Sequence, residues 1–142
     1  MENGIYVSIN YKAALKIEEG FKNHEFRNYI PKQDFKKLYV YVTKPSCKLK
    51  YILEIDDIIH FPNKIAENGD GNYEFNNGEK KKYAYHISRV YKLEYPISLK
   101  ELKEKYKFMP PQSFVYKNRY LSLTEYLENA KKTLIWENKK II

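Results

Sequence analysis

The sequence predicts an α+β fold, in which a small mixed or antiparallel β-barrel is flanked by helices. Short segments in its first two thirds alternate apolar and polar residues, the period of half-buried strands. Helix signals gather in the last third, where two capping boxes occur. This order favours a barrel with helices packed outside over a parallel doubly wound sheet. The 142 residues contain no repeat or linker, so we expect a single domain over residues 1–142.

Strand patterns account for most of the chain before residue 96. In the first of them, Ile5, Val7 and Ile9 alternate with polar or amphipathic neighbours, which places the three on one face. A break at Pro31 or Pro45 ends two of the later segments. The predicted strands or extended segments are residues 5–10, 21–27, 38–43, 50–61, 83–95 and 112–116.

Helices are predicted at three places. The first covers residues 11–19 and stops at Gly20, a common helix terminator. Capping boxes at residues 98–101 and 122–125 begin the other two. The final helix carries an apolar stripe at spacings of three and four, and we expect Trp136 to anchor it in the core. That stripe consists of Leu123, Tyr126, Leu127, Ala130 and Leu134.

A polar excursion separates the fourth and fifth strands. Residues 62–80 contain the turn signals Gly69-Asp70-Gly71 and Asn76-Asn77-Gly78. Loops of this length are usually functional or mobile. The lysines at 80–82 are either a solvated loop end or a contact for a phosphate backbone.

Charge and cysteine usage limit the functional classes. The net charge of +8 favours polyanionic partners, although a lysine excess is also what an AT-rich genome produces. The single cysteine, Cys47, forms no internal disulfide, which suits a reducing compartment. With no basic segment leading into an apolar run, we expect no signal peptide and no membrane association, and therefore a cytoplasmic protein.

Residues 20–27 form the pattern G-x-K-x-x-E-x-R, which carries Lys22, Glu25 and Arg27. In extended backbone, alternate residues share a face, so Glu25 and Arg27 are predicted neighbours while Lys22 and His24 lie opposite them. A carboxylate beside a guanidinium can read the edge of a nucleobase. The alternative is that the pair is an ion pair that only stabilises the barrel.

This segment resembles the signature of ASCH domains, a branch of the PUA-like superfamily. The order of a strand with Ser8-Ile9, a helix and then the Gly-Lys-Glu-Arg pattern is similar to that family. A second similarity lies in residues 96–99 and 110–114, where the chain reads Pro-Ile-Ser-Leu and Pro-Pro-Gln-Ser-Phe. The resemblance spans roughly residues 5–116. It implies a PUA-like barrel whose central cleft is lined by Lys22, Glu25 and Arg27.

A binding module is the leading functional class that this resemblance implies. PUA-like relatives typically hold a nucleotide or modified base in an aromatic-lined pocket. For this chain we expect no cofactor. We therefore expect RNA or a nucleotide as the partner, with Tyr6 and Tyr83 as further stacking candidates. The predicted ligand-binding residues are Ser8, Lys22, Glu25, Arg27, Tyr39, Tyr41 and Phe114.

Three alternatives are considered beside binding. Some ASCH-like proteins are ribonucleases with a Lys, Tyr and Ser set, and Lys22 would be the catalytic residue in such an enzyme. Others are amidohydrolases that deacetylate acetylcytidine with a threonine three residues after the lysine. Here Glu25 occupies that position, which argues against this activity. A protein-binding inhibitor from a mobile element is a further possibility.

No metal site is predicted. His24, His60 and His86 are scattered along the sequence, with no carboxylate or cysteine at the spacing of metal ligands.

Overall fold

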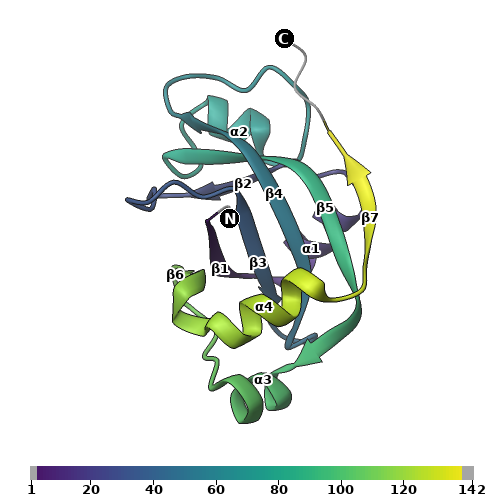
Figure 1. Cartoon of the computed structure of the whole chain (residues 1–142). Coiled ribbons are helices and arrows are strands. Elements are labelled where there is room, and N and C mark those ends of the chain that lie inside the picture. The colour runs from purple at the N-terminus through teal and green to yellow at the C-terminus, as the bar shows by residue number, and fades with distance from the viewer. Residues whose placement is uncertain (1–2, 139–142) are drawn as a thin grey trace.

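The computed structural model describes residues 3–138, which form one curved mixed sheet with helices packed against it (Figure 1). The strands are β1 (Gly4–Ile9), β2 (His24–Arg27), β3 (Lys37–Val42), β4 (Lys48–His60), β5 (Tyr83–Ser98), β6 (Val115–Tyr116) and β7 (Lys132–Glu137). The helices are α1 (Tyr11–Glu18), α2 (Asn72–Asn76), α3 (Leu99–Tyr106), the 3-10 turn η1 (Lys117–Tyr120) and α4 (Leu121–Asn129).

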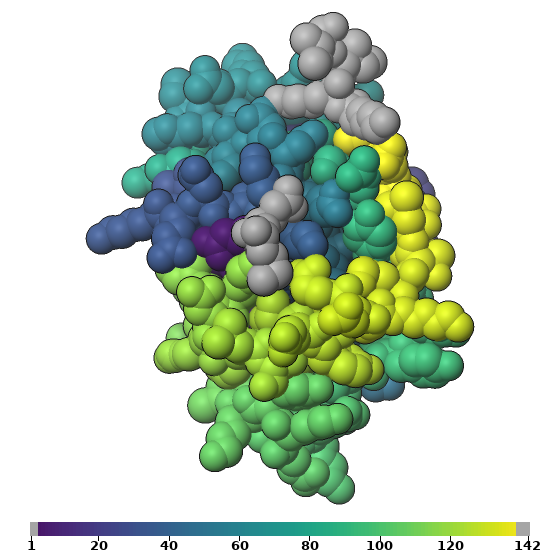
Figure 2. Space-filling view, in the orientation of Figure 1, coloured from purple at the N-terminus to yellow at the C-terminus, as the bar shows by residue number. Residues whose placement is uncertain are grey.

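Strand pairing makes a half-barrel and confirms the predicted α+β class. The order is β2-β5-β4-β3-β1-β6, and β7 adds to β5. β1 and β3 run parallel, because α1 and the following segment carry the chain back across the sheet, while the other pairs are antiparallel. The space-filling view shows the α3 and α4 region packed below the strands (Figure 2).

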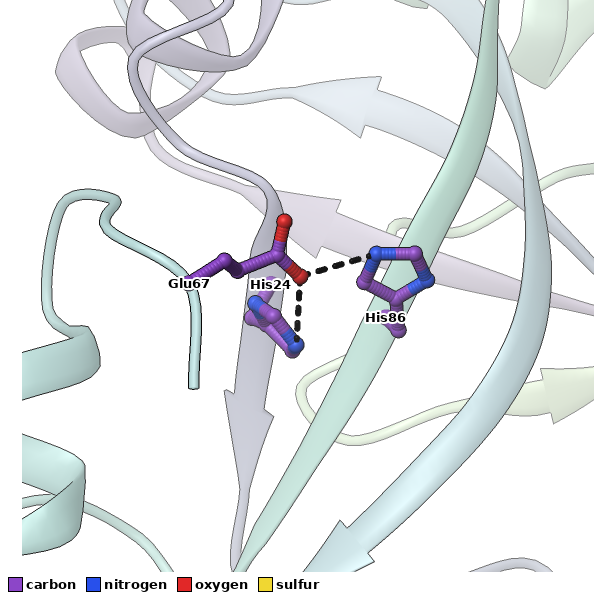
Figure 3. Close-up of side chains that lie close together, drawn as sticks. All are labelled: His24, Glu67 and His86. Atoms are coloured by element: carbon purple, nitrogen blue, oxygen red, sulfur yellow. Dashed lines mark ion pairs between the residues drawn. The ribbon is translucent and has the colours of Figure 1, made fainter. Parts of the chain in front are cut away.

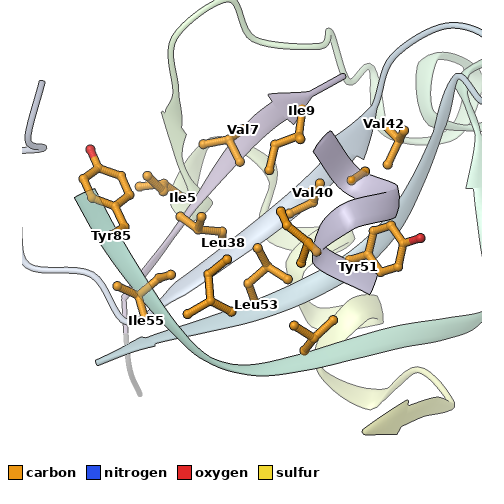
Figure 4. Close-up of a cluster of buried hydrophobic side chains, with 14 of the residues drawn as sticks. Ile5, Val7, Ile9, Leu38, Val40, Val42, Tyr51, Leu53, Ile55 and Tyr85 are labelled. Carbon is orange, nitrogen blue, oxygen red and sulfur yellow. The ribbon is translucent and has the colours of Figure 1, made fainter. Parts of the chain in front are cut away.

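Alternation along the strands produces the two larger of the three hydrophobic clusters among residues 3–138. One face of β1, β3 and β4 contributes Ile5, Leu38 and Leu53 to a first cluster that α1 covers with Ala14 and Ile17 (Figure 4). The opposite face contributes a second cluster, against which α3 and α4 pack. Its members include Tyr6, Tyr39, Tyr41, Leu102, Phe108, Leu123 and Leu127.

Local signals place α1 and α3 where the sequence predicts them. The Asn10 side chain accepts a hydrogen bond from the Ala13 amide and caps α1. Ser98 caps α3 by accepting from the Glu101 amide at 3.2 Å, as its capping box predicts. The 62–80 excursion also contains the short helix α2, which the turn signals did not reveal.

The predicted final helix is wrong at both ends. It begins at Leu121 instead of being capped by Ser122, and it ends at Asn129, after which Ala130 is extended. The following residues form β7, which pairs with β5. Trp136 therefore belongs to a strand, and its indole Nε1 donates to the Ile17 carbonyl at 2.6 Å, anchoring α1 instead of α4. No helix among residues 3–138 is long and apolar enough to cross a bilayer.

Candidate functional site

A pocket of about 490 Å³ lies where β1, β2 and the end of the 62–80 excursion meet. Four residues of the predicted set line it together: Ser8, Lys22, Glu25 and Arg27. Further lining comes from Tyr29, Asp70, Lys80, Lys81, Gln112 and Ser113. The motif thus contributes side chains to one concave site, alongside segments far away in the sequence.

Glu25 is the centre of the polar network in this pocket. As the alternation of β2 predicts, Arg27 lies beside it, with Nη2 at 2.7 Å and Nε at 2.9 Å from Glu25 Oε2. The other carboxylate oxygen, Oε1, is 3.7 Å from Lys22 Nζ. All three side chains are nearly buried, so one carboxylate compensates two cations in a weakly solvated place.

Arg27 uses most of its donors on the protein. Beyond Glu25, its guanidinium donates to the Tyr29 hydroxyl at 3.2 Å and to the Ser8 carbonyl at 3.1 Å. Burial by itself lowers the pKa of Arg27, but the charges and hydrogen bonds of Glu25 and Tyr29 together outweigh it, and the pKa is raised. Arg27 therefore stays charged and fastens β2 to β1, the strand that carries Ser8.

Lys22 is differently placed from what the alternation predicted. It precedes β2, which begins at His24, so the two-residue period of a strand does not apply, and Lys22 joins Glu25 in the pocket. Its Nζ lies 4.4 Å from the ring centroid of Phe26. Burial lowers the pKa of the Lys22 ammonium, while Glu25 and Asp70 act in the opposite direction.

Hydroxyl groups and one aromatic ring contribute another part of the pocket wall. Ser8 Oγ donates to the Pro111 carbonyl at 2.8 Å, and the Tyr29 hydroxyl donates to the Ser113 carbonyl at 3.0 Å. Tyr29 also stacks on Phe114, with ring centroids 5.1 Å apart. Phe114 thus supports the wall without lining the pocket. Through Pro111, residues 110–114 contact Ser8 at this point.

The structure places the other predicted aromatics elsewhere. Tyr6, Tyr39 and Tyr41 are buried in the second core cluster, because their positions on β1 and β3 face α3 and α4. Tyr39 donates to Glu128 there. Tyr83 stacks on His60. The tyrosine at the pocket is Tyr29, which sequence reasoning missed.

A signal for Tyr29 was present in the sequence. It follows Arg27 by two residues, and the two-residue period of extended backbone brings such neighbours to one face. Lys80 and Lys81 were predicted to be either a solvated loop end or a phosphate contact. Both residues are exposed to solvent, and both line the pocket. No sequence signal indicated Asp70, because a contact between distant residues brings it to the pocket. The Asp70 amide donates a hydrogen bond to the Phe21 carbonyl.

The three histidines are scattered along the sequence, but the fold brings two of them together. His24 and His86 are directly opposite each other on β2 and β5, and both are fully buried. Glu67 reaches them from the 62–80 excursion. Only His60 stands apart, exposed on β4.

Comparisons with known proteins identify the fold. No family model matches the chain, and no curated protein does. The crystal structure of ASCH from Zymomonas mobilis is similar over 90% of this chain and 96% of that one, with 22% identity and a TM-score of 0.65.

The crystal structures of two mutants of the same Zymomonas mobilis protein are also similar to this chain. A tyrosine-to-phenylalanine mutant has 20% identity, coverage of 90% and 99%, and a TM-score of 0.64. A serine-to-alanine mutant has 21% identity, coverage of 86% and 94%, and a TM-score of 0.62. At this level of identity the likeness establishes architecture, and the half-barrel of this chain is the ASCH fold.

Proposed function

We propose that this protein binds single-stranded RNA, or a nucleotide, in the pocket built around Lys22, Glu25 and Arg27. The observation that carries the proposal is the convergence of these side chains with Ser8 and Tyr29 on one cavity. Its volume of about 490 Å³ lies within the range of roughly 300–1,000 Å³ typical of small-ligand sites. The ASCH fold agrees with this proposal, since PUA-like relatives typically hold a nucleotide or base.

The charge of the pocket suits an anionic ligand. Lys22, Arg27, Lys80 and Lys81 oppose Glu25 and Asp70, so its lining carries two more cations than anions. The exposed Lys80 and Lys81 stand at the rim, where contacts to successive phosphates of a strand are sterically easy. Tyr29 offers a partly exposed aromatic ring, and stacking on such a ring tolerates any base.

Lys22 is the residue that we expect to meet the ligand directly. Its contact with Glu25, at 3.7 Å, is longer than a hydrogen bond, which leaves ammonium donors for a phosphate or a base carbonyl. Glu25 and Arg27 then hold the pocket in shape and balance its charge, because Arg27 is already engaged with Ser8 and Tyr29.

A titration of fluorescently labelled single-stranded RNA, followed by anisotropy at several salt concentrations, tests this assignment. Lys22→Met keeps the length of the side chain and removes its charge. Lys100→Ala, at an exposed position of α3, removes the same charge away from the pocket and is the matched control. Each phosphate contact to a single strand contributes about 0.7 to the slope of log K against log salt.

We expect Lys22→Met to weaken binding and to lower that slope by about 0.7, while Lys100→Ala changes neither appreciably. Equal weakening by the two variants would mean that only net charge matters and that the pocket is not the site. A titration with a nucleoside monophosphate in the same series shows whether one nucleotide suffices.

Hydrolysis of RNA in the same pocket is a second candidate. The favouring observation is that the Lys22 amine lies in one cavity with the hydroxyls of Ser8 and Tyr29, groups that can carry a proton in a cleavage step. Incubation of total RNA with the protein, with and without a chelator, should then give products that Lys22→Met abolishes. No products from the wild type over long incubation would leave binding alone.

A further inference from the structure

Two buried histidines and a carboxylate converge behind β2, on the side away from Glu25 and Arg27. His24 and His86 are cross-strand partners of β2 and β5, so their side chains share a face. Glu67 extends from the 62–80 excursion, and the Nε2 atoms of both rings point at the same carboxylate oxygen (Figure 3). Both histidines have no exposed surface, whereas about a third of the Glu67 side chain is exposed.

The spacing of the three ligand atoms fits a single small ion. Glu67 Oε1 lies 3.0 Å from His86 Nε2 and 3.9 Å from His24 Nε2, and all three atoms are within 4.8 Å of one another. Two ligands of a tetrahedral zinc ion, each about 2.0–2.2 Å from it, lie roughly 3.3–3.6 Å apart. The observed distances bracket that value, so small side-chain shifts would complete the coordination.

Hydrogen bonds on the far side of each ring fix its tautomer. Asn23 donates through Nδ2 to the Asn68 carbonyl, so its Oδ1 accepts, and that oxygen lies 2.7 Å from His24 Nδ1. The Asp56 carboxylate lies 2.5 Å from His86 Nδ1. Both Nδ1 atoms therefore carry the hydrogen and both Nε2 lone pairs face Glu67. Metal-binding histidines are oriented by such partners.

Glu67 is positioned as well. Its second oxygen, Oε2, accepts from Asn138 Nδ2 at 3.1 Å. His86 Nε2 is buried and has no hydrogen-bond partner among the described residues, although Glu67 Oε1 is only 3.0 Å away. A metal ion between the two atoms would satisfy that nitrogen, as buried polar atoms in proteins nearly always are.

We propose that His24, His86 and Glu67 bind a divalent transition-metal ion, with Zn²⁺ as the preferred occupant. Two imidazole nitrogens and one carboxylate oxygen suit Zn²⁺, whereas Mg²⁺ and Ca²⁺ select sites made of oxygen ligands. Three protein ligands leave the fourth position for water or the second Glu67 oxygen. The ion would link the 62–80 excursion to β2 and β5.

The metal link would also affect the pocket, but the proposal of a metal site does not depend on what the pocket binds. The linked segment also carries Asp70 and Lys80 to the pocket rim, and Lys81 follows it directly. Because the histidines occupy the other side of β2, metal binding and RNA binding can be measured and can fail separately.

Isothermal titration calorimetry with Zn²⁺ tests the proposal on the full chain, without an affinity tag and stripped by a chelator. Glu67→Gln changes a partly exposed ligand, and Asp56→Asn changes the exposed partner of His86, so both variants should keep the fold. His60→Ala removes an exposed histidine outside the cluster and is the control. Circular dichroism checks that each variant is folded.

We expect one Zn²⁺ per chain, binding at least about tenfold weaker in Glu67→Gln and about 10–100-fold weaker in Asp56→Asn. His60→Ala should bind like the wild type. Zn²⁺ should also slow amide exchange over residues 65–72 in the wild type and not in Glu67→Gln. The proposal is overturned if wild type and Glu67→Gln bind Zn²⁺ equally, or if neither binds it.

Discussion

Replacing Glu25 by glutamine tests whether the pocket network is a buried charge cluster or a solvated ion pair. The change keeps the size of the side chain, but it turns one of the two acceptor oxygens into an NH₂ donor. That donor must face either Arg27, whose nitrogens lie 2.7 and 2.9 Å away, or Lys22 at 3.7 Å. Two cations then share a neutral partner in a place with little water.

The magnitude follows from the burial of the three side chains. They are 8%, 10% and 13% exposed for Lys22, Glu25 and Arg27, and removal of one partner from a buried pair costs about 3–5 kcal/mol. Arg27 keeps its bonds to Ser8 and Tyr29, which reduces the loss. We therefore expect Glu25→Gln to lower the free energy of unfolding by about 2–4 kcal/mol.

Urea unfolding, followed by the fluorescence of the single tryptophan, Trp136, measures this change. With an m-value of about 1–3 kcal/mol/M, a loss of about 3 kcal/mol shifts the midpoint by roughly 1–3 M. Glu94→Gln is the matched control, since Glu94 and Lys131 form an exposed pair at 3.5 Å. It should alter the free energy of unfolding by no more than about 0.5 kcal/mol.

A double variant sharpens the result. Adding Lys22→Met to Glu25→Gln removes one of the two uncompensated cations, so the double variant should be less destabilised than the sum of the single changes. If Glu25→Gln costs less than about 1 kcal/mol, as exposed ion pairs do, the cluster is solvated and the reasoning from burial is refuted.

Two further predictions use the same unfolding assay. Glu128 is partly buried, which raises its pKa, but hydrogen bonds from Tyr39 and Lys37 together with nearby lysine charges prevail and lower the pKa below 4.5. The stability advantage of wild type over Glu128→Gln should thus be full at pH 7 and disappear as the pH falls below 4.5; an advantage independent of pH would contradict it. Gly20→Ala, at φ +86° in open space, should cost about 1–2 kcal/mol. Gly71→Ala, at φ +85°, should cost more, because its Cβ would lie 2.6 Å from a phenylalanine ring carbon; equal costs would show that the ring moves freely.

Sequence reasoning located most of the strands and the capped helix α3 because these depend on local signals. Alternation in residues 5–10 needs only the two-residue period, and the Ser98 cap needs only a side chain and an amide three residues on. It failed at β7 because Leu127, Ala130 and Leu134 also fit a helical period. Pairing with β5, which lies about forty residues earlier in the chain, decided that segment.

At the pocket, the sequence predicted that Glu25 and Arg27 are neighbours, because both belong to one strand. It placed Lys22 on the wrong side, since a strand period was extended beyond the residue where β2 begins. It also treated Tyr39 and Tyr41 as ligand contacts, because a half-buried strand has the same pattern whichever layer covers each of its faces. In the structure, α3 and α4 cover the face of β3 that carries Tyr39 and Tyr41.

By itself, then, the sequence determined the α+β class, the G-x-K-x-x-E-x-R segment and the Glu25–Arg27 pair, all of which rest on contacts between residues close in the chain. The tertiary structure decided which distant residues lie beside these local features. Residues 8, 29, 80 and 113 converge on one pocket, and residues 24, 67 and 86 converge behind β2, only because strand register and a long excursion bring distant segments together. No local pattern encodes such contacts, since the side chains involved find their partners only after the sheet has formed.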